Sequence, residues 1–570
     1  MFYSYLKLFN LTAEITTSER KFRMKSHLVK TLLNYLSKRN WLVIALLFLL
    51  VELFIWPTGE FPLNDDWSYS RSVEAYVNYG KIQFSDWVAI PFVSQYLIGI
   101  FFSKVFGFSF FSLRLGSIVL SFLMIFIFDK LLKSLSVRDY FRFFINLLLV
   151  FNPLFLTMGN TFLPDTYTLF FALCSFYFMI KYILENKSLN FILFIICTLL
   201  GTMTRQTGIL LPFLFSLIFF FSKKKTLKNI LISFTPFLVN FLTLFTFEKS
   251  AKYYDILPKT YNLQLNAIID ILQHFSINSF LYISLNFLLA TICLGIFILP
   301  ITISNFKFHL NQIKNSIISK VLLLLFIVLL IVKPLLTIHI LPFNGNIFFF
   351  TGIGPVIMTG LNTQAVTEIS LTVRIISVIL HLMGGVSFFV AFHAIILWII
   401  NSIKKKTVFF PIFFVLLLFG YLTPICFNYA NDRYLLLLIP FFFISYLLSV
   451  TFKLKKLGFS LIFIPIFFFS VIGVRDYFSI NNSRWKALDY LTTIQHITPY
   501  KIDGGFEFNA WHLYGKANYK TRHNNRWWFI DDDEYIISPQ KKDGYTIEKK
   551  FPLKSIMTYS YDQMYILKRK

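Results

Sequence analysis

Two adjacent carboxylates, Asp65 and Asp66, follow the first long apolar run of the chain, within Leu63-Asn64-Asp65-Asp66-Trp67-Ser68-Tyr69. Ionised side chains gain nothing from a nearby bilayer, so such a pair is either an ordinary solvated pair or a reactive centre held at the membrane surface. A carboxylate beside a hydroxyl or amine can accept its proton while that group attacks an anomeric carbon. Asp65 and Asp66 are therefore candidate catalytic residues, with a solvated pair of loop carboxylates as the alternative.

The composition is that of a membrane protein. Of 570 residues, 56% are hydrophobic and only 14% are charged, whereas soluble domains carry about a quarter charged residues. Apolar runs that approach the length needed to cross a bilayer recur along the chain. We predict an all-α polytopic membrane bundle with 13 spans, at 41–57, 112–130, 142–158, 165–183, 189–203, 208–222, 229–247, 279–303, 320–341, 375–402, 408–426, 434–452 and 457–474.

Basic residues are concentrated in alternate loops, for example in 223–225 and 404–406, which are runs of three lysines. By the positive-inside rule these loops are cytoplasmic. Residues 1–40 then form a basic cytoplasmic segment and residues 41–475 the transmembrane domain, and with an odd number of spans residues 476–570 are extracytoplasmic. We expect a multi-pass protein of the inner (plasma) membrane with its N-terminus in the cytoplasm and its C-terminus outside.

The net charge of +26 resides largely in those loops and forms no basic stripe with interleaved aromatics. Nucleic acid is therefore not an expected partner. The four cysteines lie in or at the ends of apolar runs, without the spacing of a disulfide framework or of metal ligands. We predict no metal site and no cofactor.

The composition changes at about residue 476. The tail is rich in charge and in tryptophan, and short alternating runs such as 535–537 and 564–567 are separated by the turn signals Asp503-Gly504-Gly505 and Asp543-Gly544. This pattern favours a small C-terminal α/β domain on the outer side.

Further candidates lie at the predicted outer ends of spans. Arg205 and Arg433 suit a lipid-linked phosphate, because a guanidinium binds phosphate oxygens through two parallel donors. The alternative for each is an interfacial arginine that reaches the lipid headgroups. Asp165, at the start of the fourth span, is a third candidate catalytic carboxylate.

Lys333 lies inside the ninth predicted span, next to Pro334. It would hold a phosphate or pair with Glu52 of the first span, unless the helix ends early and Lys333 reaches the interface. Tyr69 and Lys81 of the first outer loop (58–111) complete the candidates for substrate or phosphate binding.

The motifs together resemble those of the GT-C glycosyltransferases, in particular the bacterial relatives of protein O-mannosyltransferases and of the lipid A aminoarabinose transferase. The resemblance rests on an acidic pair after the first span, on a long outer loop, on 13 spans and on an outer tail. Weaker similarities are the segments Pro164-Asp165-Thr166-Tyr167, Thr204-Arg205-Gln206-Thr207-Gly208, Asp432-Arg433-Tyr434 and Ile502-Asp503-Gly504-Gly505-Phe506-Glu507. A His-Pro-Pro turn typical of many members is missing, and Ile90-Pro91-Phe92 stands in its place.

The resemblance implies a GT-C-like fold and an inverting transfer of a monosaccharide from a polyprenyl-phosphate donor to an extracytoplasmic lipid, glycan or protein. It places the catalytic residue at Asp65, with Asp66 where the family commonly has Glu. Trp67 and Trp87 of the same loop are candidates for stacking on a sugar. The partners implied are this donor, its acceptor and the bilayer.

A lipid-linked sugar flippase or transporter is the alternative function. Flippases usually carry charges along a path through the bundle and often show paired repeats. Here the acids and arginines gather on one predicted face, which favours one-sided chemistry.

Overall fold

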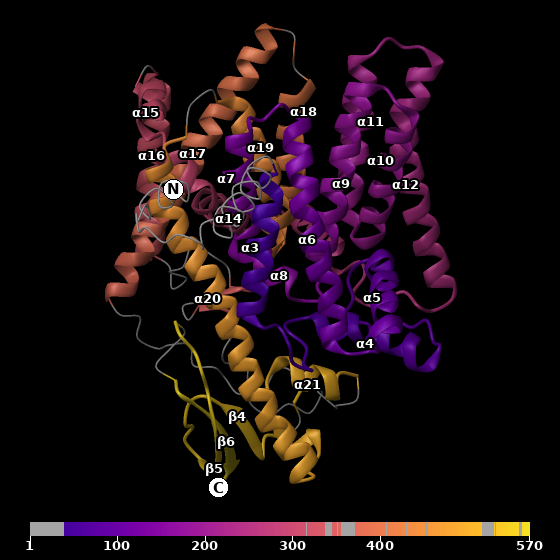
Figure 1. Ribbon diagram of the computed structural model, residues 1–570, viewed down its shortest axis with the longest axis vertical. Helices are drawn as coiled ribbons and strands as arrows, with labels where there is room; N and C mark the ends of the chain where they lie inside the picture. Colours follow the sequence, from indigo (N-terminus) through magenta and orange to yellow (C-terminus); the bar gives the residue numbers. More distant parts are fainter. Residues whose placement is uncertain are drawn as a thin grey trace, which may run out of the picture.

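The computed structural model describes residues 39–314, 316–336, 345–349, 352–354, 371–405, 407, 409–428, 431–450, 454–515, 529–530, 532–557 and 561–570. Most helices run along the long axis of the molecule, and a small C-terminal sheet lies at the lower end in Figure 1. This arrangement confirms the predicted helical membrane bundle with a small C-terminal α/β domain.

Within the described residues, eight helical segments are long and apolar enough to cross a membrane. They are α6 (Phe110–Ser134), α9 (Pro164–Glu185), α12 (Leu227–Tyr253), α14 (Ile277–Ile303), α17 (Leu371–Lys404), α18 (Phe409–Phe427), η3 with α19 (Asp432–Ser449) and α20 (Lys456–Asp489). Two bent helix pairs raise this number to 10, namely α7 (Asp139–Val150) with α8 (Pro153–Gly159), and α15 (Phe306–Lys314) with α16 (Ile317–Leu336).

The remaining predicted spans coincide with helices that are shorter, α3 (Asn40–Ile55), α10 (Ser188–Thr204) and α11 (Leu210–Ser222), the last preceded by η2 (Gln206–Ile209). Each of the 13 predicted spans therefore has a helical counterpart, although only the longer ones meet the length of a bilayer crossing. The turn between α11 and α12 and the end of α17, which carry the lysine runs, lie at the upper end, opposite the sheet (Figure 1).

Helices α7 and α8 meet at a bend of 59°. The Asn152 side chain accepts a hydrogen bond from the backbone N–H of Leu154 at 2.9 Å, and Pro153 occupies the first helical position. Proline lacks an N–H and favours a helix start, so the chain restarts as α8 and does not continue α7. This short helix leads directly to Pro164 and so places Asp165 at the beginning of α9.

The first loop, residues 58–111, forms two helices at the lower end, α4 (Asp66–Tyr79) and α5 (Val93–Phe106) (Figure 1). The loop ends at Ser109, whose hydroxyl accepts a hydrogen bond from the Ser112 N–H at 2.9 Å and caps α6.

The long helix α20 connects the bundle to the C-terminal domain without a break. The predicted boundary at residue 476 therefore falls inside a helix. Beyond it lie η4 (Tyr490–Ile494), η5 (Pro499–Lys501) and α21 (Phe506–Leu513), and a sheet of strand order β3-β4-β6-β5. Strand β3 (Ile502–Asp503) is parallel to β4 (Tyr535–Ser538), whereas β6 (Gln563–Arg569) is antiparallel to β4 and to β5 (Tyr545–Pro552).

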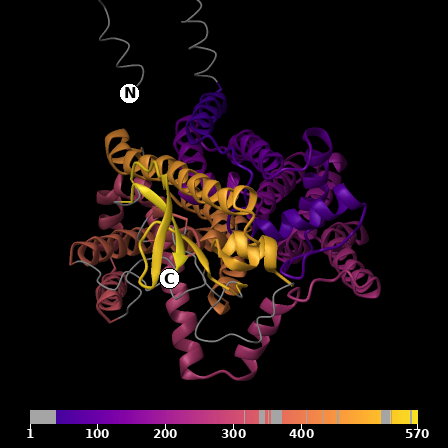
Figure 2. The ribbon, with the colours of Figure 1, turned by 90° about the horizontal axis from the view of Figure 1, so that it is seen from below.

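From below, the sheet and α21 cover part of the lower end, next to the indigo helices of the first loop (Figure 2). Helix α21 packs against α4. Two further elements reach this end, the helix α13 (Leu263–Gln273) and a hairpin of β1 (Phe348–Phe349) and β2 (Gly352–Ile353). The loop, the hairpin and the C-terminal domain therefore surround the same place.

Candidate functional site

A tight turn before α4 carries Asp65. Asn64 has a left-handed backbone conformation (φ 57°), and its side-chain oxygen accepts a hydrogen bond from the Asp65 N–H at 2.8 Å. Asparagine is among the few residues that adopt this conformation readily. The Ser68 hydroxyl donates to the Asp65 carbonyl at 2.8 Å. These local bonds fix the backbone of Asp65 independently of its side chain, which is then left for other partners.

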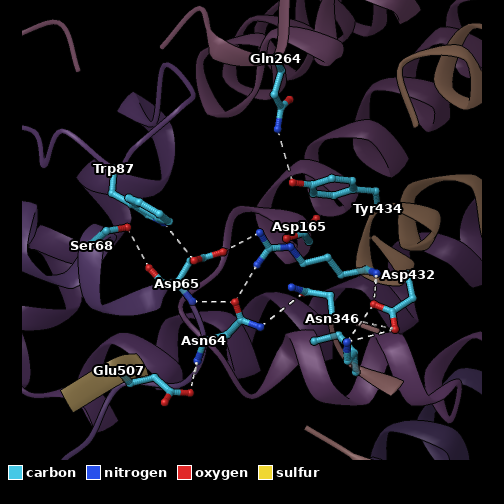
Figure 3. Close-up of polar contacts among 12 residues, drawn as sticks. Asn64, Asp65, Ser68, Trp87, Asp165, Gln264, Asn346, Asp432, Tyr434 and Glu507 are labelled. Atoms are coloured by element: carbon cyan, nitrogen blue, oxygen red, sulfur yellow. Dashed lines mark hydrogen bonds and ion pairs between the residues drawn. The ribbon is translucent and has the colours of Figure 1, made fainter. Parts of the chain in front are cut away.

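The Asp65 carboxylate receives two donors from other elements. One oxygen forms an ion pair with Arg433 at 2.7 Å, and the other accepts the indole N–H of Trp87 at 3.1 Å. The Asp65 side chain is 17% exposed, compared with 7% for Arg433. Figure 3 shows Asp65 held between Trp87 and the guanidinium group. The carboxylate is therefore oriented and still accessible.

The second acidic residue, Asp66, has a different environment although it is the next residue. It is 1% exposed, and its two oxygens accept the backbone N–H groups of Leu63 at 2.6 Å and Phe162 at 3.4 Å. Burial raises the pKa of Asp66 to about 8, and the nearby Arg114 opposes that rise. Asp66 thus ties the turn to the segment before α9. Its expected catalytic role stays a prediction.

A second buried ion pair lies beside the first. Asp165, on the first turn of α9, pairs with Arg205 at 3.0 Å, and their side chains are 3% and 15% exposed. The other oxygen of Asp165 is buried, with no hydrogen-bond partner among the described residues. Such an acceptor is costly to leave unpaired, which makes it a candidate to bind a substrate hydroxyl.

The ring of Tyr434 lies close to both arginines. The guanidinium carbon of Arg205 is 4.8 Å from the ring centroid, and that of Arg433 is 5.4 Å from it. The side-chain amide of Gln264, on α13, donates a hydrogen bond to the Tyr434 hydroxyl at 3.4 Å (Figure 3). The aromatic face attracts both cations and so keeps two like charges close together.

Arg433 is held in place by its neighbour. The carboxylate of Asp432 accepts the backbone N–H groups of Ile347 at 2.9 Å, Phe348 at 2.8 Å and Arg433 itself at 2.8 Å. The β1–β2 hairpin is thereby attached to the start of η3. Arg433 also donates to the Asn64 side chain at 3.4 Å, so the turn and η3 share a network of bonds.

Three other expected site residues have different positions. Tyr69 is buried near Asp65 and Arg433, and burial raises the pKa of its hydroxyl. Lys81 is exposed beyond the far end of α4, about 20 Å from Asp65 at 1.5 Å per helical residue. The structure does not bring it to the site. Lys333 is on α16, but its side chain lies outside the described part of the chain.

A cavity of about 350 Å³ opens next to Arg205 and Tyr434. Its walls come from α12, α13 and α18, and most of its surface is apolar. The buried hydroxyl of Tyr421 lines it without a hydrogen-bond partner among the described residues. The charged residues that line the cavity are Arg205 and Glu248. The apolar space beside the Arg205 guanidinium fits the head of an amphipathic phosphate ester.

Trp67 is fully buried and packs in an aromatic cluster with Trp87, Phe506, Tyr514 and Phe529. It is therefore a packing residue, whereas Trp87 is partly exposed and contacts Asp65. In the described residues, no three His, Cys, Asp or Glu side chains gather as a metal site would require. The expectation of no metal stays a prediction.

The motifs did not identify Asn64, Asn346 or Glu507 as neighbours of Asp65. Asn64 could have been suspected, because an asparagine directly before Asp65 suits a tight turn. Asn346 and Glu507 could not, since they contact Asn64 from positions 282 and 443 residues away in the chain.

Comparison with protein families gives a match over residues 90–248 to the family described as dolichyl-phosphate-mannose-protein mannosyltransferase. Asp165 and Arg205 lie inside the matched segment, and Asp65 and Arg433 lie outside it. The match confirms the relationship to GT-C glycosyltransferases that the motifs indicated. No curated protein matches significantly.

Among solved structures, the oligosaccharyltransferase AglB of Archaeoglobus fulgidus, in complex with an inhibitory peptide and a dolichol-phosphate, is 14% identical with a TM-score of 0.42. The match covers 87% of this chain and 62% of AglB. ArnT of Cupriavidus metallidurans in the apo state is 12% identical with a TM-score of 0.35, covering 92% of this chain and 97% of ArnT. ArnT bound to undecaprenyl phosphate gives 12% and 0.34, with 92% and 98% covered.

Proposed function

From the glycosyltransferase family match and the geometry around Asp65, we propose that this multi-pass membrane protein transfers a monosaccharide from a polyprenyl-phosphate donor to an extracytoplasmic acceptor. The observation that carries the proposal is the ion pair of Asp65 with Arg433, which lies beside Arg205 and the cavity at Tyr434. The acceptor is a lipid, a glycan or a protein.

The donor phosphate binds at the arginines. Arg205 reaches the cavity, and Arg433 lies on the same aromatic ring, so both guanidinium groups can face one phosphate. The apolar walls of the cavity accommodate the part of the donor next to the phosphate, and the rest of the isoprenoid chain extends into the bilayer. The family description, which names a dolichyl-phosphate sugar, supports this donor class.

Asp65 activates the acceptor. Its carboxylate accepts the proton of the acceptor hydroxyl or amine as that atom forms a bond to the anomeric carbon. The bond between the anomeric carbon and the phosphate oxygen breaks with its electron pair on the phosphate, whose added negative charge Arg205 and Arg433 neutralise. One displacement of this kind inverts the anomeric centre. The lipid phosphate leaves as a stable anion, so the proposal includes no cofactor.

The other candidates have supporting roles. The unpaired oxygen Oδ2 of Asp165 accepts a hydrogen bond from a hydroxyl of the sugar or of the acceptor. Its other oxygen, Oδ1, forms the ion pair that holds Arg205 in position. The hydroxyl of Tyr69 lies near both Asp65 and Arg433 and donates to the phosphate or the sugar. Asp66 anchors the turn through the N–H groups of Leu63 and Phe162.

The test is release of polyprenyl phosphate by the purified protein from a panel of polyprenyl-phosphate sugars, measured with and without envelope extract as the acceptor source. Transfer of sugar with release of the lipid phosphate is the expected result. In parallel, proteoliposomes report whether a fluorescent lipid-linked sugar changes leaflet. If the lipid-linked sugar crosses the membrane intact and no member of the panel is consumed, the protein is a flippase and the proposal fails.

A further inference from the structure

The C-terminal domain reaches the turn that carries Asp65. Glu507, on the first turn of α21, accepts the backbone N–H of Asn64 at 3.1 Å. Glu507 is 1% exposed and Asn64 is 8% exposed, so water does not compete for this bond. In Figure 3, Asn64 lies between Glu507 and Asp65.

The orientation of Glu507 is fixed by a second contact. Its other carboxylate oxygen forms an ion pair with Arg484 of α20 at 2.7 Å, and the side chains are 1% and 6% exposed. A buried carboxylate requires such a counter-charge. The ion pair with Arg484 thus orients the other oxygen of Glu507 toward the turn at Asn64. Arg484 itself lies on α20, which is continuous from the helical bundle.

The side chain of Asn64 contacts both Asp65 and Arg433, the two members of the proposed reactive ion pair. Its side-chain oxygen accepts the N–H of Asp65 at 2.8 Å and a guanidinium N–H of Arg433 at 3.4 Å. Asparagine adopts its left-handed backbone conformation (φ 57°) readily, and the bond from the Asn64 N–H to Glu507 fixes where this turn lies. A displaced Asn64 would therefore move Asp65 and Arg433 relative to each other.

The aromatic cluster supplies a second connection from the same domain. Phe506, next to Glu507, lies 6.4 Å from the ring of Trp87, and Tyr514 lies 5.8 Å from it. Trp87 in turn donates to the Asp65 carboxylate. The backbone of Asp65 and one of its carboxylate oxygens are thus both located by contacts that involve α21.

We propose that Glu507, oriented by Arg484, is a positioning residue that sets the geometry of Asp65 and Arg433, so that the C-terminal domain completes the reactive site. The inference rests on the proposed function, since it concerns the rate of the same transfer. Glu507 touches neither substrate nor reacting atoms. Its loss lowers turnover and leaves the donor cavity, which is built from other elements, unchanged.

The experiment compares Glu507→Ala and Glu507→Gln with the wild type in kcat, in Kd for polyprenyl phosphate and in thermal stability. We expect Glu507→Ala to lower kcat by about 10- to 100-fold, because misplacement of reacting groups by about 1 Å has effects of that size. The Kd should change less than about threefold. Glu507→Gln keeps an acceptor for the Asn64 N–H and should restore part of the lost kcat.

The matched control is Asp533→Asn. Asp533 is also 1% exposed, pairs with Arg569 and accepts the Tyr545 hydroxyl within the same domain. It should lower stability without a comparable fall in kcat. The inference is overturned if Glu507→Ala retains kcat within about twofold, or if Asp533→Asn lowers kcat equally at equal loss of stability. If Glu507→Ala does not fold, Glu507→Asp takes its place, because it keeps the charge that faces Arg484 and withdraws the acceptor from the Asn64 N–H. A Glu507→Asp enzyme with wild-type kcat and pH profile overturns the inference.

Asp65→Asn in the same series separates the two hypotheses. An inactive wild type, or an Asp65→Asn enzyme as active as the wild type, refutes the proposed function and the inference with it. Loss of turnover in Asp65→Asn but not in the Glu507 variants refutes the inference alone.

Discussion

The buried pair of Asp165 and Arg205 makes a quantitative prediction about stability. Arg205→Gln leaves the Asp165 carboxylate, which is 3% exposed, without its direct partner, and removal of one partner of a buried pair costs about 3–5 kcal/mol. Arg433 also interacts with Asp165, so we expect the lower end of that range. Asp165→Asn costs less, about 1–3 kcal/mol, because Arg205 is more exposed and still stacks on Tyr434.

In the double variant Asp165→Asn/Arg205→Gln, neither residue leaves an unpaired buried charge behind. Its loss of stability should therefore be smaller than the sum of the single losses, with a coupling energy of about 1–3 kcal/mol. Unfolding by SDS in mixed micelles, followed by tryptophan fluorescence, measures the three differences. The control is the helical pair Lys181–Glu185, with side chains 30% and 29% exposed, whose coupling should be much smaller because solvent screens it.

The result that refutes the reasoning is additivity within about 0.5 kcal/mol, because two groups without coupling do not form one buried ion pair. The same variants separate stability from binding. Asp165→Asn keeps Arg205 and should bind polyprenyl phosphate within about tenfold of the wild type, whereas the double variant loses a charge-assisted contact and should bind more weakly by a further factor of about 10 or more.

The remaining predictions concern the loop that carries Asp65. Burial raises the pKa of Asp66 to about 8, so the folded state holds its proton more tightly than the unfolded chain. The stability of the wild type relative to Asp66→Asn should therefore fall as the pH rises from about 4 to about 8 and stay level above it. A relative stability that rises with pH would contradict the burial of Asp66. Trp87→Phe removes the donor to Asp65 and should lower kcat by about 10-fold with little change in Tm, whereas equal kcat would show that this bond does not orient the carboxylate. Lys81→Ala should leave kcat and Kd for the donor within about twofold, since α4 separates Lys81 from Asp65 by about 20 Å, and a larger effect would place it in the substrate path.

The fold was largely predictable because bilayer crossing imposes long apolar runs, and every predicted span has a helical counterpart. The breaks were not. The predicted span 142–158 bends at Asn152 and Pro153, where the cap of α8 interrupts an apolar run. The predicted domain boundary at residue 476, which stays a prediction, lies within α20, a helix that is continuous from Lys456 to Asp489.

The site was predictable in its residue types but not in its contacts. Asp65 and Asp66 are adjacent residues of one type, and only the family resemblance distinguished them in the sequence. The turn at Asn64 places one carboxylate against Arg433 and the other against backbone N–H groups. The Asp65–Arg433 pair joins positions 368 residues apart. Local periodicity carries no information on such a contact, which depends on how the loop 58–111, η3 and the C-terminal domain assemble.

The central claim is that the Asp65 carboxylate accepts the acceptor's proton. Its most direct test is the single-turnover rate of sugar transfer from the active donor in the wild type and in Asp65→Asn, with the Kd for the donor measured on the same samples. We predict a fall in rate of about 100-fold or more, together with a Kd that is unchanged or lower, because the substitution releases Arg433 for the phosphate. A single-turnover rate in Asp65→Asn within about threefold of the wild type would contradict the claim.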